Sequence, residues 1–445
     1  MLRFGTDGVR GVANAELTPE LALALGRAAA RVLGGGRFAI GRDTRRSGPL
    51  LEAALAAGLA AEGIEVVTLG VAPTPEVAWW AATEQAPAAV VSASHNPFGD
   101  NGIKLFSAGG RKLADAVEER LEAELGALVG GGAGDRRAVP TGAAVGSIRA
   151  IDAAAGYTAA VAASLEGRRL DGLRAVVDCA NGAASSVAPG ALRALGVELD
   201  VIHADPDGTN INAGCGSTHP DDLRRAVVGH GAHVGVAFDG DADRVLLVDA
   251  NGDLVDGDHI IAMCALDRHD RGALAYDTVV VTVMTNLGFR LAMDARGVRV
   301  VETAVGDRNV LEALVAGGYA LGGEQSGHVI FPELATTGDG LLTAVQALDV
   351  VVRSGRPLAE LAAASMTRLP QVLRNVRVGR RDPAILDRIA ADVAAVEGRL
   401  GDKGRVLVRP SGTEPLVRVM VEAPTEADAA TAADELVRAV EGAAD

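Results

Sequence analysis

Strand-like and helix-like segments alternate along most of this chain, in three successive cycles that end near residue 365. In the first cycle, Thr18 and Pro19 have the residue types that begin a helix, and the glycines at 34–36 end it. Short apolar runs such as 88–91 predict buried strands. This alternation is typical of α/β domains, in which helices cover a sheet.

The last part of the chain has a different order, with strands at 372–378, 405–409 and 416–422 and helices at 383–396 and 426–440. This order suits a small α+β domain. We therefore predict three related α/β domains with mixed sheets and a smaller C-terminal α+β domain. The predicted boundaries are 1–150, 151–248, 249–365 and 366–445.

Charge and composition exclude several classes of partner. The net charge is −16 and no basic run occurs, so we expect neither nucleic acid nor an anionic membrane surface as a partner. No stretch approaches the ~20 apolar residues of a membrane span. The cysteines Cys179, Cys215 and Cys264 are scattered, and the N-terminus lacks the apolar core of a signal peptide. Both features predict reduced thiols and a cytoplasmic protein.

The first chemistry-bearing loop follows the strand 88–91 and reads SASHNPFGDNGIK, from Ser92 to Lys104. Pro97 and two glycines keep it irregular, so that Ser94 and His95 can be presented outward. A serine hydroxyl is a weak nucleophile that needs a neighbouring base or metal, and Ser94 could instead simply cap a turn. Lys104 stands out because the chain has only three lysines among its 42 basic residues, and lysine, unlike arginine, can exchange a proton.

The second loop, DGDADR, follows the strand 234–238 and places Asp239, Asp241 and Asp243 at alternate positions. Three carboxylates this close repel one another without a positive partner, and oxygen ligands suit Mg²⁺. An EF-hand is excluded, because Arg244 and Ala250 stand where its Gly and Glu would be. The alternative is a solvated acidic turn. Because Mg²⁺ usually keeps substrate phosphate among its ligands, the loop predicts a phosphate nearby.

Two further loops carry polar clusters. GGEQSGH places Glu324 and Ser326 two residues apart, which suits the hydroxyls of a sugar, with His328 as a group for proton transfer or for structure. RPSGTEP, with Arg409 and the later Arg418, has the composition of a phosphate cradle but lacks a Walker lysine; a polar hairpin turn is the alternative. Near the start, FGTDGVRG brings Arg10, which could touch a phosphate.

Together these five motifs, in this order, resemble the α-D-phosphohexomutase family over nearly the whole chain, and the Gln325 version of the sugar loop resembles the glucosamine branch. The resemblance implies a heart-shaped protein around a central cleft. It also implies interconversion of glucosamine 6-phosphate and glucosamine 1-phosphate, with a phosphoserine and glucosamine 1,6-bisphosphate as intermediates and one Mg²⁺ per chain. A small sugar phosphate is the implied partner, and a homodimer is the implied assembly. The implied pathway is the supply of UDP-N-acetylglucosamine for cell-wall synthesis.

The resemblance also assigns roles residue by residue. Ser94 would carry the phosphate and, with Asp239, Asp241 and Asp243, hold the metal. Lys104 would be the candidate general base, with Arg10 and His95 as further catalytic groups. The substrate-binding residues would be Arg244, Glu324, Ser326 and His328. The phosphate-binding residues would be Arg409, Ser411, Gly412, Thr413 and Arg418.

Three alternatives remain open at this point. The nearest is the same fold acting on mannose or glucose phosphates. A catalytically inactive sugar-phosphate sensor is disfavoured because the serine, the three aspartates and Lys104 are all retained. A phosphatase is disfavoured because no obvious water-activating base neighbours Ser94 in the sequence.

Overall fold

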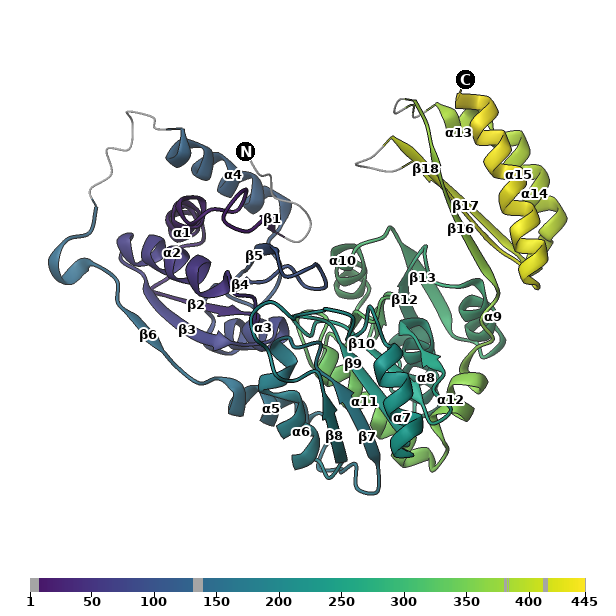
Figure 1. Ribbon diagram of the computed structural model, residues 1–445, viewed down its shortest axis with the longest axis horizontal. Coiled ribbons are helices and arrows are strands. Elements are labelled where there is room, and N and C mark those ends of the chain that lie inside the picture. Colours follow the sequence, from purple (N-terminus) through teal and green to yellow (C-terminus); the bar gives the residue numbers. More distant parts are fainter. Residues whose placement is uncertain (1–7, 131–138, 380–381, 383, 411–414, 445) are drawn as a thin grey trace. The chain divides into compact units, whose positions relative to one another are not determined.

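The computed structural model describes residues 8–130, 139–379, 382, 384–410 and 415–444. The chain divides into two compact units, Met1–Met284 with Val298–Ala363, and Thr285–Gly297 with Ala364–Asp445 (Figure 1). The described part of the first unit contains three sheets, each with both parallel and antiparallel pairs. The described part of the second unit contains one antiparallel sheet. The predicted mixed α/β architecture with a small α+β end is therefore confirmed.

The first sheet has the strand order β1-β5-β4-β2-β3-β6. Its strands are β1 (Val9–Val12), β2 (Arg37–Arg42), β3 (Glu65–Val71), β4 (Ala88–Val91), β5 (Asp100–Phe106) and β6 (Ile148–Ala150). Its helices are α1 (Pro19–Leu33), α2 (Gly48–Ala61), α3 (Thr74–Glu84) and α4 (Asp115–Val129). Helix α1 begins as the sequence predicts, with the Thr18 hydroxyl accepting a hydrogen bond from the N–H of Leu21 at 3.3 Å.

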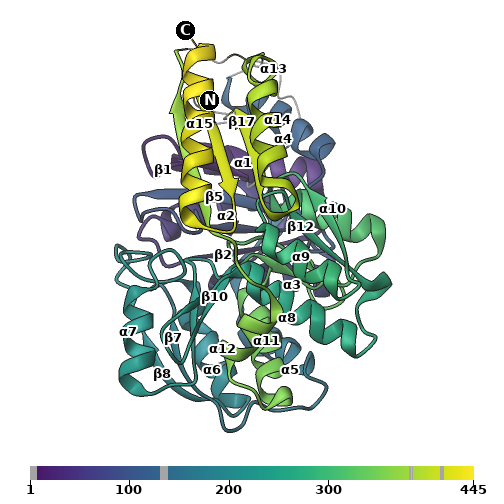
Figure 2. The same cartoon turned by 90° about the vertical axis from the view of Figure 1, so that its right-hand side faces the viewer.

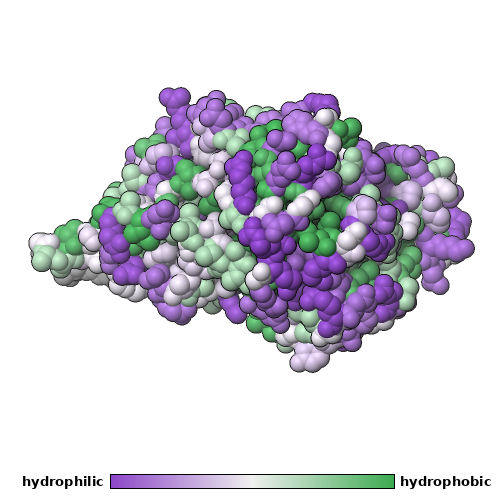
Figure 3. Space-filling model, turned by 90° about the horizontal axis from the view of Figure 1, so that it is seen from below, coloured by the Kyte–Doolittle hydropathy of each residue, from purple (hydrophilic) through white to green (hydrophobic). Residues whose placement is uncertain are grey.

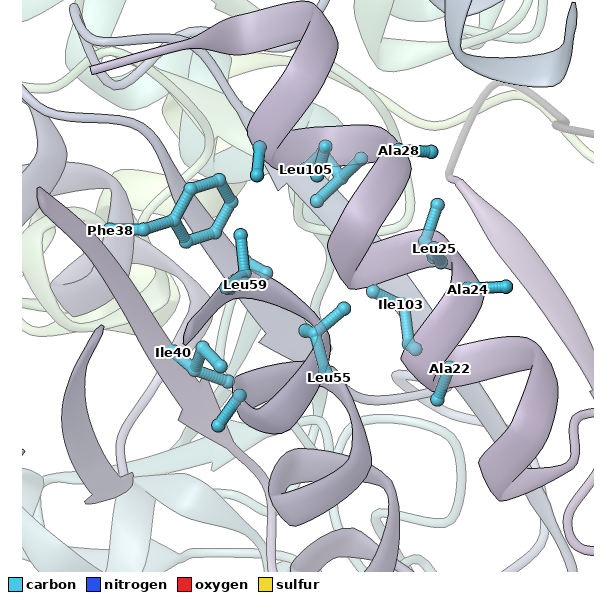
Figure 4. Packing of buried hydrophobic residues seen from close by; sticks show 14 of the residues in the cluster. Ala22, Ala24, Leu25, Ala28, Phe38, Ile40, Leu55, Leu59, Ile103 and Leu105 are labelled. Carbon is cyan, nitrogen blue, oxygen red and sulfur yellow. The ribbon is translucent and has the colours of Figure 1, made fainter. Parts of the chain in front are cut away.

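The two faces of this sheet are buried by different helices. Phe38 and Ile40 pack with Leu55 and Leu59 of α2 and with Leu25 of α1, as Figure 4 shows. The intervening residue of β2, Ala39, packs in a second cluster that contains residues of α3. This is the two-residue alternation of a strand that is buried on both faces.

The second sheet has the order β11-β10-β9-β7-β8 and the third has the order β13-β12-β14-β15. The second sheet and its helices comprise β7 (Arg174–Asp178), β8 (Glu198–Ile202), β9 (Val234–Phe238), β10 (Val245–Asp249), β11 (Leu254–Val255), α5 (Ala154–Ala163), α6 (Ala188–Ala194) and α7 (Asp221–His230). The third comprises β12 (Thr278–Thr282), β13 (Arg299–Thr303), β14 (Gly322–Gly323), β15 (Val329–Ile330), α8 (Gly257–Asp270), α10 (Asp307–Gly317) and α11 (Gly340–Ser354). Helix α12 (Leu358–Ser365) leads to the second unit.

The second unit places helices α14 and α15 on one face of the sheet β16-β18-β17 (Figure 2). Its elements are α9 (Leu287–Ala295), β16 (Gln371–Arg377), α13 (Ile385–Arg388), α14 (Ala390–Leu400), β17 (Arg405–Pro410), β18 (Leu416–Glu422) and α15 (Glu426–Ala444). Helix α9 follows β12 in the chain but belongs here, because the buried carboxylate of Glu422 accepts a hydrogen bond from the N–H of Leu287 at 2.9 Å.

The structure differs from the sequence analysis at two places in its helices. Helix α3 was not predicted, because its eleven residues are mostly apolar and show little one-sided periodicity. The single helix expected over 383–396 is two helices, α13 and α14, that meet near Ile389.

On the face shown in Figure 3, hydrophilic side chains are interspersed with small hydrophobic areas. Among the described residues, no helix combines the length and the apolar character needed to cross a bilayer. The three cysteines are buried and none forms a disulfide.

Candidate active site

Ser94 lies in the loop between β4 and β5 and is 1% exposed. Its φ of 50° is in the left-handed region, which costs a residue with a side chain about 1–3 kcal/mol unless its surroundings enforce it. Here the surroundings do so. The carbonyl oxygen of Ser94 accepts hydrogen bonds from Arg45 and from Asn212, both at 2.9 Å. The N–H of Ser94 donates to the hydroxyl of Ser92, also at 2.9 Å.

The side chain of Arg45 fixes the backbone of the loop that contains Ser94 (the serine loop). Its guanidinium is fully buried, forms an ion pair with Asp43 at 2.8 Å, and donates to the carbonyls of Ser94, Asn96, Pro97 and Asp100. The hydroxyl of Ser92 donates to the same aspartate at 2.7 Å. Burial raises the pKa of Asp43, although Arg45 acts to lower it. Residues 43–45, which follow the end of β2, thus provide structural support for the serine loop.

The acidic loop after β9 lies directly against Ser94. The hydroxyl of Ser94 donates to Oδ2 of Asp239 at 2.6 Å. Ligand atoms of Asp239, Asp241 and Asp243 all lie within 4.8 Å of one another, and the three residues are 0%, 1% and 6% exposed. Gly240 permits this approach, because a Cβ atom there would lie 2.5 Å from the carbonyl oxygen of Ser94.

The three carboxyl groups have unequal electrostatic environments. Burial, together with the charges of Asp243 and Asp241, raises the pKa of Asp239 well above its ordinary value. Burial also acts to raise the pKa of Asp241, but the ammonium of Lys104 and a hydrogen bond from Thr74 outweigh it and the pKa is lowered. Lys104 lies 2.9 Å from Oδ2 of Asp241 and 3.3 Å from Oδ2 of Asp243.

The acidic loop fits a hard divalent cation. Oδ1 of Asp241 and Oδ1 of Asp243 are buried, and neither accepts a hydrogen bond from any described residue. Buried carboxylate oxygens without donors carry a large desolvation cost. An all-oxygen donor set of this charge is the kind that Mg²⁺ prefers, whereas zinc favours nitrogen and sulfur.

Cationic and basic side chains surround Ser94 and the acidic loop. Nδ1 of His95 lies 3.5 Å from the Ser94 hydroxyl and 3.4 Å from a guanidinium nitrogen of Arg244. Burial lowers the pKa of His95, and the charges of Arg244 and Arg10 add to the effect. Arg10 lies in β1 opposite Gly102 of β5. The structure therefore brings Ser94, His95, Lys104 and Arg244 together around the three aspartates.

The segment GGEQSGH, residues 322–328, is the sugar-type loop, and it contains the turn between β14 and β15. Glu324 is partly buried and accepts a hydrogen bond from the N–H of Gly306 at 3.1 Å, while Ser326 is exposed. His328 is 2% exposed, and its Nε2 lies 3.5 Å from Oδ2 of Asp307. Asp307 in turn forms an ion pair with Lys112. The side-chain amide of Gln325 donates a hydrogen bond of 3.2 Å to Asp256, the residue that caps the N-terminus of α8, so Gln325 has a structural contact in this loop.

In the second unit, Arg409 of β17 and Arg418 of β18 are register partners on adjacent antiparallel strands. Burial lowers the pKa of Arg409, and the charge of Arg418 adds to the effect. Two guanidinium groups placed side by side favour a bound anion. Ser411, Gly412 and Thr413 lie outside the described residues.

Sequence reasoning missed two residues that support the acidic and serine loops. The hydroxyl of Thr74 donates to Oδ2 of Asp241 at 2.6 Å, and its N–H donates to the carbonyl of the same residue at 2.9 Å. Asn212 holds the Ser94 carbonyl. The sequence signal for Thr74 is its position between Pro73 and Pro75 at the start of α3. We find no such signal for Asn212.

Comparisons with known proteins match the chain along nearly its full length. It matches the phosphoglucomutase/phosphomannomutase alpha/beta/alpha domains I, II and III at residues 1–128, 155–252 and 256–369, and the C-terminal domain at 373–439. It is 56% identical to a phosphoglucosamine mutase of Frankia alni over 99% of this chain and 98% of that one. It is 54% identical to one of Rhodococcus jostii over 98% of both chains. A putative phosphomannomutase structure from Thermus thermophilus superposes with a TM-score of 0.80 at 26% identity, covering 99% of both chains.

Proposed function

Because the chain belongs to the phosphoglucomutase/phosphomannomutase family, we propose that it is an isomerase that interconverts glucosamine 6-phosphate and glucosamine 1-phosphate. The choice of glucosamine is supported by relatives of 54% and 56% identity that carry this activity in their names. The observation that carries the chemistry is the 2.6 Å contact between the Ser94 hydroxyl and Asp239 of the acidic loop.

In the proposed reaction, Ser94 is first phosphorylated and then acts as phosphoryl donor and acceptor in turn. The anomeric hydroxyl of glucosamine 6-phosphate attacks the phosphoryl group, its O–P bond forms as the Ser94 O–P bond breaks, and the sugar becomes the 1,6-bisphosphate. In the return step, the hydroxyl of Ser94 takes the phosphoryl group from position 6 and releases glucosamine 1-phosphate. Transfer of this kind depends mainly on placement and on neutralising charge. The left-handed backbone at Ser94, held by Arg45 and Asn212, supplies the placement.

Asp239, Asp241 and Asp243, with the phosphate of Ser94, would hold one Mg²⁺ per chain. When bound, the ion neutralises negative charge on the phosphoryl group. The Oδ1 atoms of Asp241 and Asp243, which are buried and accept no hydrogen bond from a described residue, support this assignment.

Proton transfer and charge stabilisation are assigned to side chains that face the same loop. Lys104 and His95 are the proposed acid–base groups, and His95 has a lowered pKa that keeps it neutral and able to accept a proton near pH 7. Arg10 and Arg244 would stabilise charge on the phosphoryl group. Glu324, Ser326 and His328 would bind the sugar.

The remaining expectations belong to the same proposal. Arg409, Ser411, Gly412, Thr413 and Arg418 would bind a phosphate of the sugar, with glucosamine 1,6-bisphosphate as intermediate and activator. We also propose the four-part division at residues 150, 248 and 365, a homodimer, and residence in the cytoplasm, where the three unpaired cysteines stay reduced.

The test is a comparison of kcat/KM for glucosamine, glucose and mannose 6-phosphates with the purified protein and Mg²⁺. We expect glucosamine 6-phosphate to be preferred. A wide preference for glucose or mannose 6-phosphate would move the chain to another branch of the family. No turnover of any of them, with Ser94 phosphorylated, would favour a sensor.

A further inference from the structure

A second group of metal-binding side chains lies in the first unit, apart from the three aspartates. Asp178, His203 and Cys215 each place one ligand atom within 4.8 Å of the other two. They offer an oxygen, a nitrogen and a sulfur, so the set differs in kind from the all-oxygen acidic loop. We propose that these three residues form a site for a thiophilic divalent cation of the zinc class, separate from the proposed mutase site.

The position of the group in the sheet suits a binding site. Asp178 ends β7, and His203 directly follows the end of β8, which pairs with β7 in parallel. Cys215 comes from the loop before α7. In α/β sheets, ligands bind beyond the carboxyl ends of parallel strands. The three residues therefore converge at that edge from segments far apart in the sequence.

The donor atoms are already held in orientations that suit a metal. Oδ1 of Asp178 accepts the N–H of Ala180 at 2.8 Å, and Oδ2 accepts the N–H of Gly216 at 2.9 Å. Nδ1 of His203 lies 3.0 Å from Asp178, while Nε2 lies 3.4 Å from a carboxylate oxygen of Asp222. A carboxylate facing the second ring nitrogen is the usual arrangement at a histidine that binds metal through the first.

The distances between the donor atoms and the path from solvent to them also suit a zinc ion. Donor atoms around a tetrahedral zinc are about 3.4–3.6 Å apart, so movements on the order of 1 Å close the group on an ion. Cys215 is fully buried, whereas the side chain of His203 is 26% exposed and gives a path from solvent. Solvent would supply the fourth ligand.

Zinc binding at this group releases one proton, from the thiol of Cys215. The ordinary pKa of a cysteine thiol is about 8.5, so a metal-free thiol carries a proton at pH 7. Zn²⁺ replaces that proton, which goes to solvent, and the sulfur binds as thiolate without any change of oxidation state.

The experiment uses the full-length protein, stripped of metal and then given excess Mg²⁺ to saturate the acidic loop. Co²⁺ is added as an optical probe, because cobalt bound to a thiolate absorbs in the near ultraviolet by charge transfer from sulfur. Zn²⁺ is then titrated in to displace it. We expect the charge-transfer band, its loss on adding zinc, and one zinc per chain by elemental analysis after dialysis.

Variants assign the band to the site. Cys215→Ser should remove it, while Cys264→Ser, at another buried cysteine, should keep it. Asp222→Asn should weaken zinc affinity by about 10-fold. His203→Ala, at a partly exposed position, provides a second ligand variant if Cys215→Ser does not fold, and should also remove the band. Absence of the band in the unaltered protein, or its survival in either ligand variant, would overturn the proposal.

Discussion

Nζ of Lys104 lies 2.9 Å from Oδ2 of Asp241, a contact that joins strand β5 to the acidic loop after β9. The same oxygen accepts the hydroxyl of Thr74, at the start of α3, at 2.6 Å. One oxygen of Asp241 is thus fully engaged by residues that precede it by more than a hundred positions, and Oδ1 is left without a donor among the described residues. Because both donors contact Oδ2, Asp241 stays ionised while its Oδ1 remains available to a cation.

Substitution of Ser94 tests the proposed nucleophile. We expect Ser94→Ala to abolish mutase turnover, because no other described hydroxyl group donates to Asp239. The fold should persist, since Arg45 and Asn212 bind the backbone carbonyl rather than the side chain. Steady-state assays and circular dichroism measure the two effects. Ser186→Ala, which removes a hydroxyl bonded to the carbonyl of Ala183, should leave the rate within about twofold. Retained turnover in Ser94→Ala would contradict the assignment.

Asp241→Asn tests the metal assignment. The amide removes one negative charge from the acidic loop and leaves Lys104 with a weaker partner, so we expect a rate about 100-fold lower and a higher Mg²⁺ concentration at half-maximal activity. Rates measured across a Mg²⁺ titration give both values. Asp249→Asn is the matched control, because Asp249 is buried at the end of β10 and its Oδ1 accepts only backbone N–H groups of Asn251 and Asp253 among the described residues. An unchanged Mg²⁺ response in Asp241→Asn would point to other ligands.

The sequence was most informative where chemistry and local structure depend on adjacent residues. The alternating carboxylates of DGDADR and the Thr18–Pro19 helix start are local patterns, and the structure bears out the helix start and places the carboxylates within 4.8 Å of one another. Strand β4 was predicted at its observed bounds because it is a short, fully buried apolar run.

The supporting contacts could not be read in the same way, because they join residues far apart in the chain. Thr74 reaches Asp241 over 167 positions, and Asn212 reaches Ser94 over 118. Nothing in the immediate neighbours of Asn212 encodes that contact. The Asp178, His203 and Cys215 group could not be predicted from the sequence for the same reason, since the cysteines alone show no metal-binding spacing.

Lys112 gives a prediction about the sugar-type loop. It forms an ion pair with Asp307, whose Oδ2 lies 3.5 Å from Nε2 of His328. We propose it as a positioning residue for this histidine, so Lys112→Ala should lower kcat/KM for glucosamine 6-phosphate by about 10-fold. Lys112→Arg, which keeps the charge, should restore most of it. Lys403→Ala, at an exposed lysine, should change nothing beyond about twofold. Equal losses of kcat/KM in the alanine and arginine variants of Lys112 would show that the charge paired with Asp307 does not determine kcat/KM.

Glu76 predicts how stability depends on pH. Its side chain is 2% exposed in α3, and Oε2 has no hydrogen-bond partner among the described residues. Burial, with the nearby charge of Asp152, raises its pKa from 4.5 to about 8. A folded-state pKa above the unfolded value means that the stabilising contribution is complete below about pH 4.5 and is lost as the pH rises through 8. Between these two limits, the contribution of Glu76 to the free energy of unfolding changes by on the order of 4–5 kcal/mol.

Glu76→Gln removes this titration and resembles the protonated carboxyl in shape. We expect the variant and the unaltered protein to unfold at similar temperatures near pH 5, and the variant to unfold at the higher temperature at pH 9. Thermal unfolding followed by circular dichroism at pH 5, 7 and 9 measures the difference. Glu84→Gln changes an exposed glutamate of the same helix and should follow the unaltered protein at every pH. If Glu76→Gln and the unaltered protein lost stability in parallel between pH 7 and 9, Glu76 would not be the group that titrates.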